Sequence, residues 1–174
     1  MTIMPINFSK NFKRQLADEI NIKYANRVLP NLGLCIALKA IEHVGAPKYV
    51  AGTTGMHVKV RFRLIVFRPF AQEVLTGVVL DSDKDGIQIS LGFFQDIYVP
   101  RENMPNTWEF NEEENAWVWN YEGNPYTIDQ DEKVNVRVEE IEYDSSRRMD
   151  SASDQGGPAM RVLASMSADG GLGC

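Results

Sequence analysis

The residue types that most often carry catalysis are sparse in this sequence and fall into no catalytic motif. His43 and His57 stand apart from any metal-binding or nucleophile–base pattern, and no serine lies in a Gly-x-Ser-x-Gly elbow. The acidic segment 81–85 is spaced like a calcium loop, but Gly92 occupies the twelfth position, where such a loop has Glu. We interpret residues 81–86 as a hairpin turn ending in Asp-Gly. We therefore expect no metal site, no cofactor and no enzymatic activity.

A second set of residues suits single-stranded nucleic acid, which binds by stacking bases on aromatic rings beside basic groups. Phe94 and Tyr98 are the candidate stacking platforms, and Lys84, Arg101 and Arg137 are the candidate backbone contacts. One of the two adjacent phenylalanines at 93 and 94 must fill the interior of the fold, so each aromatic also has a purely structural interpretation.

A third set forms a basic stripe. His57, Lys59, Arg61 and Arg63 alternate with apolar residues, and alternate residues of a strand lie about 6.6–6.8 Å apart on one face. That spacing suits contacts with phosphates or with an acidic protein surface, and the alternative is a solvated outer face. The same face then becomes apolar. Its last two residues are Ile65 and Phe67.

Charge is unevenly distributed along the 174 residues. Residues 1–70 hold 11 Lys and Arg against 3 Asp and Glu, a balance of +8, and residues 71–174 hold 7 against 21, a balance of −14. This asymmetry indicates two modules with different partners, or two halves that attract each other. Phosphate contacts dominate non-specific RNA affinity, so the acidic half predicts weak, salt-sensitive binding. Most of its acids fall at 102–122 and 129–154, away from the expected RNA face.

The composition is that of an ordinary globular protein, with 44% hydrophobic and 24% charged residues. No apolar run approaches the roughly 20 residues that span a bilayer, so we expect no membrane contact. The opening residues lack the pattern of a secretory signal. Cys35 and Cys174 fit neither a disulfide framework nor a metal spacing, which favours a reducing compartment.

The first half must position the basic stripe. Apolar residues every four positions from Phe8 to Tyr24 predict a helix, with Asn7 or Ser9 as its cap. The segment 32–44 is apolar on both faces and predicts a buried strand. A loop at 45–55 and one long strand at 56–67 follow, and the domain boundary is expected near residue 70. The first domain, 1–70, is therefore an α+β fold.

The second domain, 71–174, consists of short strands. We expect strands at 73–80, 86–91, 93–99, 133–141 and 158–166, with Gly77 relieving crowding where the first of them coils. The region around 101–130 is expected to be an acidic insertion, irregular over 101–116 and containing the aromatic Trp-Val-Trp-Asn-Tyr at 117–121. The polar segment 144–157 is expected to be flexible. Short antiparallel strands with glycine at the corners fit a small closed barrel, an all-β OB fold.

At this point four stretches of sequence resemble a known family. They are LPNLGLCIALKAI, MHVKVRFRLIVFRPFAQEVLTGVV, GIQISLGFFQDIYVP and WVWNY. Together they are similar to the stalk subunit of eukaryotic RNA polymerase III, which is related to the stalk subunits of polymerases I and II and to the corresponding subunit of the archaeal RNA polymerase. The resemblance runs from about Pro5 to Gly173.

The resemblance implies a tip domain followed by an S1-type OB-fold barrel, with no active site. It implies a heterodimer with a helical stalk partner subunit, docked by the tip on the RNA polymerase III core near the RNA exit path. It further implies support of transcription initiation in the nucleus and contact between the barrel and nascent RNA. Two departures from the family are expected. The chain begins almost at the helix, so either its start is incomplete or the family's first strand is missing, and its C-terminus ends before the family's short aromatic end.

Two other functions stay open. A free-standing S1-domain factor of translation or RNA decay would bind single-stranded RNA alone, although the acidic second half argues against it. A nuclease would need a carboxylate cluster around a divalent metal. On the leading hypothesis, Lys59, Arg61 and Arg63 help the first domain dock on an acidic polymerase or partner surface.

Overall fold

The computed structural model describes residues 2–3, 12–29, 31–49, 56–105, 107–114, 116–121, 124–144 and 159–166. It divides into two compact units, Met1–Arg68 and Pro69–Cys174, each described by itself below. The division falls beside the expected boundary near residue 70. The expected helix cap at residue 7 or 9, and the segment 144–157 apart from its first residue, lie outside the described residues.

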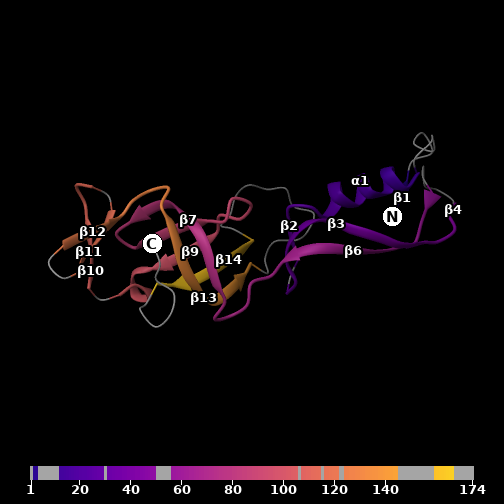
Figure 1. Cartoon of the computed structure of the whole chain (residues 1–174). Helices are drawn as coiled ribbons and strands as arrows, with labels where there is room; N and C mark the ends of the chain where they lie inside the picture. Colours follow the sequence, from indigo (N-terminus) through magenta and orange to yellow (C-terminus); the bar gives the residue numbers. More distant parts are fainter. Residues whose placement is uncertain are drawn as a thin grey trace. The chain divides into compact units, whose positions relative to one another are not determined.

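The N-terminal unit combines one helix with two small sheets in the described residues (Figure 1). β2, β3 and β6 form an antiparallel sheet in the order β2-β3-β6, and β1, β5 and β4 form a second in the order β1-β5-β4. The bounds of the elements in chain order are β1 (Thr2–Ile3), α1 (Phe12–Tyr24), β2 (Arg27–Leu29), β3 (Gly33–Val44), β4 (Lys48–Tyr49), β5 (Met56–His57) and β6 (Val60–Phe67).

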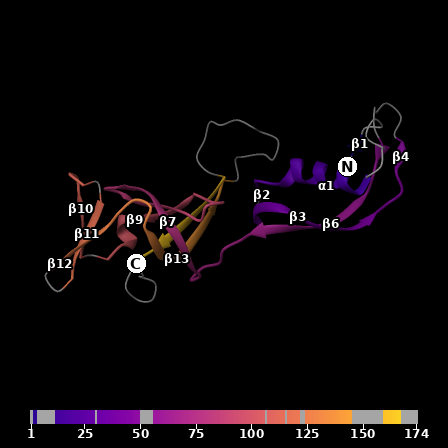
Figure 2. The ribbon, with the colours of Figure 1, turned by 45° about the horizontal axis from the view of Figure 1, so that its top comes forward.

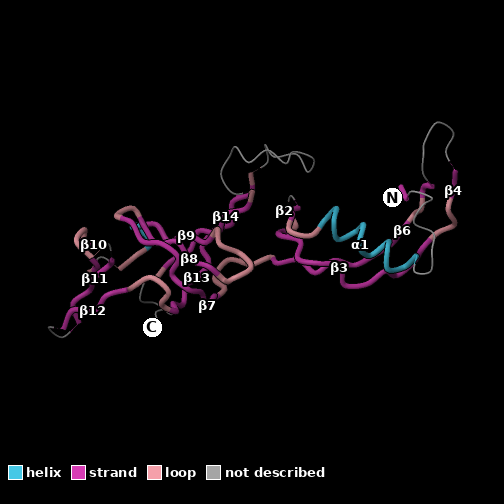
Figure 3. Tube along the Cα trace, turned by 90° about the horizontal axis from the view of Figure 1, so that it is seen from above, coloured by secondary structure: helices cyan, strands magenta, loops and turns pink. Residues whose placement is uncertain are grey.

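The helix α1 forms where the four-residue apolar spacing predicts it, and it lies along the sheet of β3 and β6 (Figures 1 and 3). Leu16 and Ile20 are fully buried against that sheet, together with Val58. The chain then turns through Asn26, whose φ of 56° is the left-handed conformation that commonly ends a helix. The partly buried residues around this cluster are Phe12, Tyr24, Leu38, Ile41, Val44, Val60, Phe62 and Leu64.

The strand β3 carries three register shifts that explain its unusual sequence. The shifts fall between Cys35 and Ala37, between Leu38 and Ala40, and between Ile41 and His43. Each inserts one extra residue opposite β6. Residues facing α1 therefore recur every third position in β3 instead of every second. The expectation that this strand is buried with two apolar faces is wrong. Its apolar residues at every third position all lie on one face, the face toward α1.

The single long strand expected at 56–67 is interrupted. β5 ends at His57 and pairs with β1 and β4, whereas β6 begins at Val60 and pairs with β3. Between them Val58 is buried in the helix-facing cluster at 2% exposure. The expected absence of a strand before the helix is also wrong, because Thr2 of β1 pairs with His57.

The C-terminal unit contains a closed barrel in the strand order β13-β14-β9-β8-β7. Neighbouring strands are antiparallel except β9 and β14, which are parallel. Figure 2 shows β9 and β13 on this barrel and the sheet of β10, β11 and β12 beside it. The bounds of the barrel strands are β7 (Val74–Asp83), β8 (Gly86–Ser90), β9 (Ile97–Pro100), β13 (Lys133–Tyr143) and β14 (Met160–Ser165).

The barrel closes because alternate residues of its short strands are apolar and point inward. Ile89, Ile97 and Val136 are each 0% exposed. Gly77 lies on β7 next to the paired strand β8, and a Cβ there would collide with the Ile89 side chain. The expectation that glycine relieves crowding at this position is confirmed.

The region between β9 and β13 is more regular than expected. The segment 101–116 is not irregular, because it contains the 3-10 helix η2 and the strand β10. Strand β9 is also shorter than the expected 93–99, because residues 91–96 form a connection. The bounds here are η2 (Arg101–Asn103), β10 (Trp108–Asn111), β11 (Ala116–Tyr121) and β12 (Asn124–Ile128).

Candidate nucleic-acid and docking surfaces

The outer face of β8 and β9 is the candidate nucleic-acid surface of the barrel, because it carries Tyr98. Ile97 and Val99 are fully buried, so Tyr98 between them points away from the interior. The side chain of Tyr98 is half-buried. Its neighbours across the ladder are Gln88 on β8 and Leu163 on β14. These three residues form a row across three strands of the outer face.

The ring of Tyr98 lies across Gly86. A Cβ built on Gly86 would come within 2.6 Å of both Cζ and Oη of Tyr98. Only a residue without a side chain leaves room for the ring there. The hydroxyl end of the ring therefore lies against β8 at Gly86.

The hairpin turn that joins β7 to β8 borders this face. Asp83 pairs with Gly86, which leaves Lys84 and Asp85 as the two turn residues. The Asp83 carboxylate accepts hydrogen bonds through Oδ1 from the backbone N–H groups of Asp85 at 2.8 Å and Gly86 at 2.7 Å. The expected hairpin is confirmed, but its turn is confined to Lys84 and Asp85, because 81–83 belong to β7. Within the described residues no group of three or more His, Cys, Asp or Glu could hold a metal ion.

The turn is held from outside by two neighbours. The indole Nε1 of Trp117 on β11 donates to the carbonyl of Asp83 at 3.0 Å. The backbone N–H of Arg101 donates to the carbonyl of Asp85 at 2.9 Å. Trp117 is 1% exposed, and its ring lies 5.5 Å from that of Phe110. The aromatic insertion sheet therefore packs on the hairpin that borders the Tyr98 face.

Charges of both signs surround Tyr98. Burial raises the pKa of its hydroxyl, the carboxylates of Asp83 and Asp85 raise it further, and the guanidinium of Arg161 lowers it. Burial likewise raises the pKa of Asp96, against the opposing effect of Arg161. Sequence reasoning missed Arg161, which is exposed on β14. It lies in a short strand with no motif, and only the parallel pairing of β14 with β9 brings it to this face.

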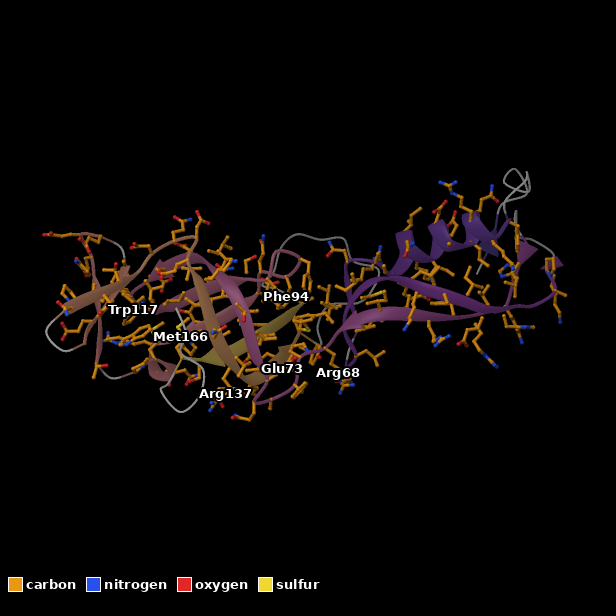
Figure 4. All side chains as sticks on the ribbon, in the orientation of Figure 1. Arg68, Glu73, Phe94, Trp117, Arg137 and Met166 are labelled. Atoms are coloured by element: carbon orange, nitrogen blue, oxygen red, sulfur yellow. The ribbon has the colours of Figure 1, made fainter. Side chains whose placement is uncertain are left out.

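Two of the expected RNA-binding residues lie elsewhere. Phe94 is only 5% exposed, so the expectation that its ring offers a stacking platform is wrong. Its neighbour Phe93 is the outward one, at 55% exposed. Arg137 lies on β13, opposite Val74 of β7, and β14 separates β13 from β9. Figure 4 shows Phe94 and Trp117 toward opposite ends of the barrel unit.

The expected candidates thus divide by position. Lys84, Tyr98 and Arg101 gather around the hairpin turn and the outer face of β9. Phe94 is buried in the connection between β8 and β9. Its backbone closes a turn there, because the Leu91 N–H donates to the Phe94 carbonyl at 2.8 Å. Arg137 faces outward from a different strand pair. A closed barrel separates residues that spacing along the sequence would place on one face.

The basic stripe of the N-terminal unit is shorter than expected. His57 belongs to the small sheet with β1 and β4, and only Arg61 and Arg63 lie on β6. Lys59 lies between the two strands and is exposed. Arg63 forms an ion pair with Glu42 of β3, with 2.7 Å between Nε and Oε1. Glu42 therefore neutralises part of the positive charge of the stripe.

The sheet face opposite α1 is open around these arginines. Arg61 lies opposite His43, Arg63 opposite Ala40, and Ile65 opposite Ala37. Ile65 is 47% exposed on this face, and Ile36 of the same strand as Ala37 is 37% exposed. Phe67 at the end of β6 is half-buried opposite Leu34. The face therefore combines exposed isoleucine with arginine.

These features define a class of protein: a two-domain protein in which an OB-like barrel follows a small α/β domain along the chain. Two family models match the chain. The model for RNA polymerase III subunit Rpc25 matches residues 73–174, and the model for the SHS2 domain found in the N terminus of Rpb7p/Rpc25p/MJ0397 matches residues 1–55. Among the described residues no helix is long and apolar enough to cross a membrane.

Curated relatives agree with both matches. The chain is 38% identical over 141 residues to DNA-directed RNA polymerase III subunit rpc8 of Dictyostelium discoideum, covering 81% of this chain and 56% of that protein. It is 35% identical over 149 residues to the Schizosaccharomyces pombe subunit rpc8, covering 82% and 73%. It is 37% identical over 140 residues to the Bos taurus subunit RPC8, covering 78% and 69%.

The chain belongs to the Rpc25 family of RNA polymerase III subunits. The resemblance seen in the sequence is confirmed, and with it the expectation of a non-catalytic polymerase subunit. Nothing in these matches supports a free-standing factor of translation or RNA decay. The chain spans little more than half of the Dictyostelium relative, and about seven tenths of the other two.

Proposed function

We propose that this chain is the barrel-bearing stalk subunit of RNA polymerase III in the nucleus. In this role it pairs with a helical stalk partner subunit, docks on the polymerase core near the RNA exit path and supports transcription initiation. The observation that carries the proposal is the Rpc25 family match across 73–174, the part of the chain that contains the closed barrel. The strand order and the parallel β9–β14 pair support an S1-type OB fold.

The docking surface in this proposal is the open face of β6 and the residues leading into it. Arg61 and Ile65 carry it, with Lys59 and the ion-paired Arg63 beside them. His57 and Phe67 mark its two ends. Exposed apolar area flanked by arginine is typical of protein interfaces. A partner segment with an apolar side chain and a carboxylate would cover Ile65 and neutralise Arg61.

The RNA contact in this proposal is the outer face of β9. Tyr98 stacks one base, and Lys84, Arg101 and Arg161 approach the phosphates on either side. Phosphate contacts of this kind weaken as salt rises. The affinity of the isolated chain is expected to be low, because Asp83, Asp85 and Asp96 share the surface.

The test uses the full chain with an affinity tag, expressed in cells of the organism from which it comes. Purification followed by mass spectrometry should recover the polymerase III subunits and one helical partner in equal amounts. Recovery of the chain as a stable monomer without polymerase subunits would contradict the stalk assignment. Crosslinking of transcribing polymerase should then place nascent RNA on the peptide that contains Tyr98, and on none from α1.

A further inference from the structure

The face around Tyr98 holds two features that a simple phosphate-binding surface would not combine. One is a half-buried aromatic ring on the outer face of the barrel, with its hydroxyl end against Gly86. The other is the carboxylate of Asp83, the residue that pairs with Gly86 across the hairpin. Its Oδ1 accepts a hydrogen bond from the Gly86 N–H at 2.7 Å, which places the carboxylate beside the ring. The ring's hydroxyl end and the Asp83 carboxylate therefore both lie against Gly86.

The Asp83 carboxylate is only partly used by the fold. Its Oδ1 accepts from the N–H groups of Asp85 and Gly86, which fixes the orientation of the carboxylate. No donor reaches its Oδ2 within the described part of the chain. A carboxylate held in place by two backbone donors, with one oxygen open beside an aromatic platform, can accept further hydrogen bonds from a stacked ligand.

Charge decides which part of an RNA strand approaches this carboxylate. Asp83 and Asp85 repel phosphates, so the sugar–phosphate backbone is kept away from the hydroxyl end of Tyr98. The exposed cations Lys84 in the turn, Arg101 after β9 and Arg161 on β14 suit the phosphates on either side of a stacked base. The bases are thus turned inward, and an edge of one base meets Asp83.

We propose that this face reads the stacked base, and that the Asp83 carboxylate selects guanine and disfavours uracil. This inference rests on the RNA contact proposed above. Guanine presents two adjacent donors, N1–H and the N2 amino group, to an acceptor-only carboxylate. Adenine and cytosine present one amino group next to a ring acceptor, and uracil presents one N–H between two carbonyls. Acceptors facing the carboxylate repel it, so guanine binds best and uracil worst.

The experiment uses the full chain purified with its stalk partner and three labelled RNAs of twelve nucleotides. Each RNA has the same unstructured background of A and C, with a single central G, inosine or U. Binding is measured by fluorescence anisotropy at low salt. Hydrogen bonds to charged groups predict about tenfold tighter binding for G than for U, with inosine, which lacks the N2 amino group, in between.

The variant that tests the mechanism is Asp83→Asn. The amide oxygen of Asn can still accept from the N–H groups of residues 85 and 86, so the turn is kept, while its NH₂ group now faces the base. This replaces an acceptor by a donor that cannot pair with the N1–H and N2 amino groups, and that can donate to O6 of guanine as well as to the carbonyls of uracil, so the preference for G over U should be lost. The matched control is Asp81→Asn, which removes the same charge from an exposed residue whose Oδ1 caps only the N–H of Ser82 at 2.9 Å. The control should keep the preference for G.

The possible outcomes separate the two proposals. Equal binding of the three RNAs, with binding still lost in Tyr98→Ala, would overturn base selection and leave the RNA contact intact. An order unchanged in Asp83→Asn would also overturn it. Binding that is insensitive to Tyr98→Ala would overturn the proposed RNA contact and the base selection together. A loss of the preference for G that is confined to Asp83→Asn supports both.

Discussion

Replacing Trp117 by Phe tests whether the insertion sheet stabilises the hairpin beside Tyr98. The indole is 1% exposed and donates to the Asp83 carbonyl at 3.0 Å. Phe retains an aromatic ring against Phe110 but removes this donor. Losing one such hydrogen bond costs about 1 kcal/mol. The smaller ring leaves a small cavity that costs about 1 kcal/mol more. We expect the free energy of unfolding to fall by about 2 kcal/mol, the sum of these two losses.

Two measurements on the full chain would show this loss. In urea the unfolding transition of the barrel unit should move down by about 1 M, from the expected loss and a typical slope for a small domain. By hydrogen exchange, the amides of Asp85 and Gly86 should exchange about 30-fold faster, the same 2 kcal/mol expressed as a rate. The matched control is Phe70→Leu, an aromatic replacement at a residue 65% exposed, which should change the transition by less than about 0.5 kcal/mol.

The exchange data separate the idea from a general loss of stability. Faster exchange confined to the hairpin and the insertion sheet is expected if Trp117 fixes the turn. Unchanged exchange at residues 85 and 86, with a lower urea midpoint, would mean that the indole only fills space. An unchanged midpoint and unchanged exchange would refute the reasoning altogether.

Three further predictions follow from the described contacts. Arg61→Glu should lower recovery of the chain with the polymerase at least tenfold without changing its circular dichroism, whereas Arg14→Glu, the same charge change on α1, should not; equal recovery would leave the open face as plain solvated surface. Gly86→Ala should displace the Tyr98 ring, whose Cζ would lie 2.6 Å from the new Cβ, and should also press on the backbone carbonyl of Val99, so RNA affinity should fall several-fold; intact affinity would show that the ring is no platform. Burial raises the pKa of the Cys35 thiol, so in a Cys174→Ser background iodoacetamide at pH 8 should modify the folded chain far more slowly than the urea-unfolded chain; similar rates would contradict the burial of Cys35.

The sequence predicted the elements whose apolar period is regular. The four-residue spacing of Leu16 and Ile20 identified α1, and the two-residue spacing of Val134, Val136 and Val138 identified β13. The order of short strands around glycine corners also predicted a closed barrel. These patterns depend only on local geometry, so a single sequence is enough to read them.

Irregular geometry was harder to predict. The register shifts of β3 place Cys35, Leu38 and Ile41 on one face at a spacing of three, which neither the helix nor the strand period describes. The break after His57 could not be predicted from the sequence, because Val58 and Val60 continue the alternation of apolar residues through it. A bulge or a break is decided by the partner strand, and the partner is unknown from the sequence alone.

The candidate site failed in a related way. Phe93 and Phe94 are chemically identical, and only the turn closed by Leu91 decides which of them is buried. Arg161 was overlooked because its place beside Tyr98 depends on a parallel pairing between strands more than 60 residues apart. Motif and composition give residue types, but the faces of a closed barrel are set by long-range pairing.

The positions of the acidic residues in the fold change what the negative charge of residues 71–174 means for RNA binding. A balance of −14 over residues 71–174 argued that the barrel half avoids RNA unless its acids lie away from the binding face. Most of them lie elsewhere in the sequence, but Asp83 and Asp85 border the Tyr98 ring and Asp96 lies near Arg161. Acids at that position weaken phosphate binding and at the same time supply acceptors for base edges. On the proposed function, Asp83 can thus give selectivity while the three carboxylates lower affinity, because a stalk that the polymerase holds beside the transcript would not depend on strong binding of its own.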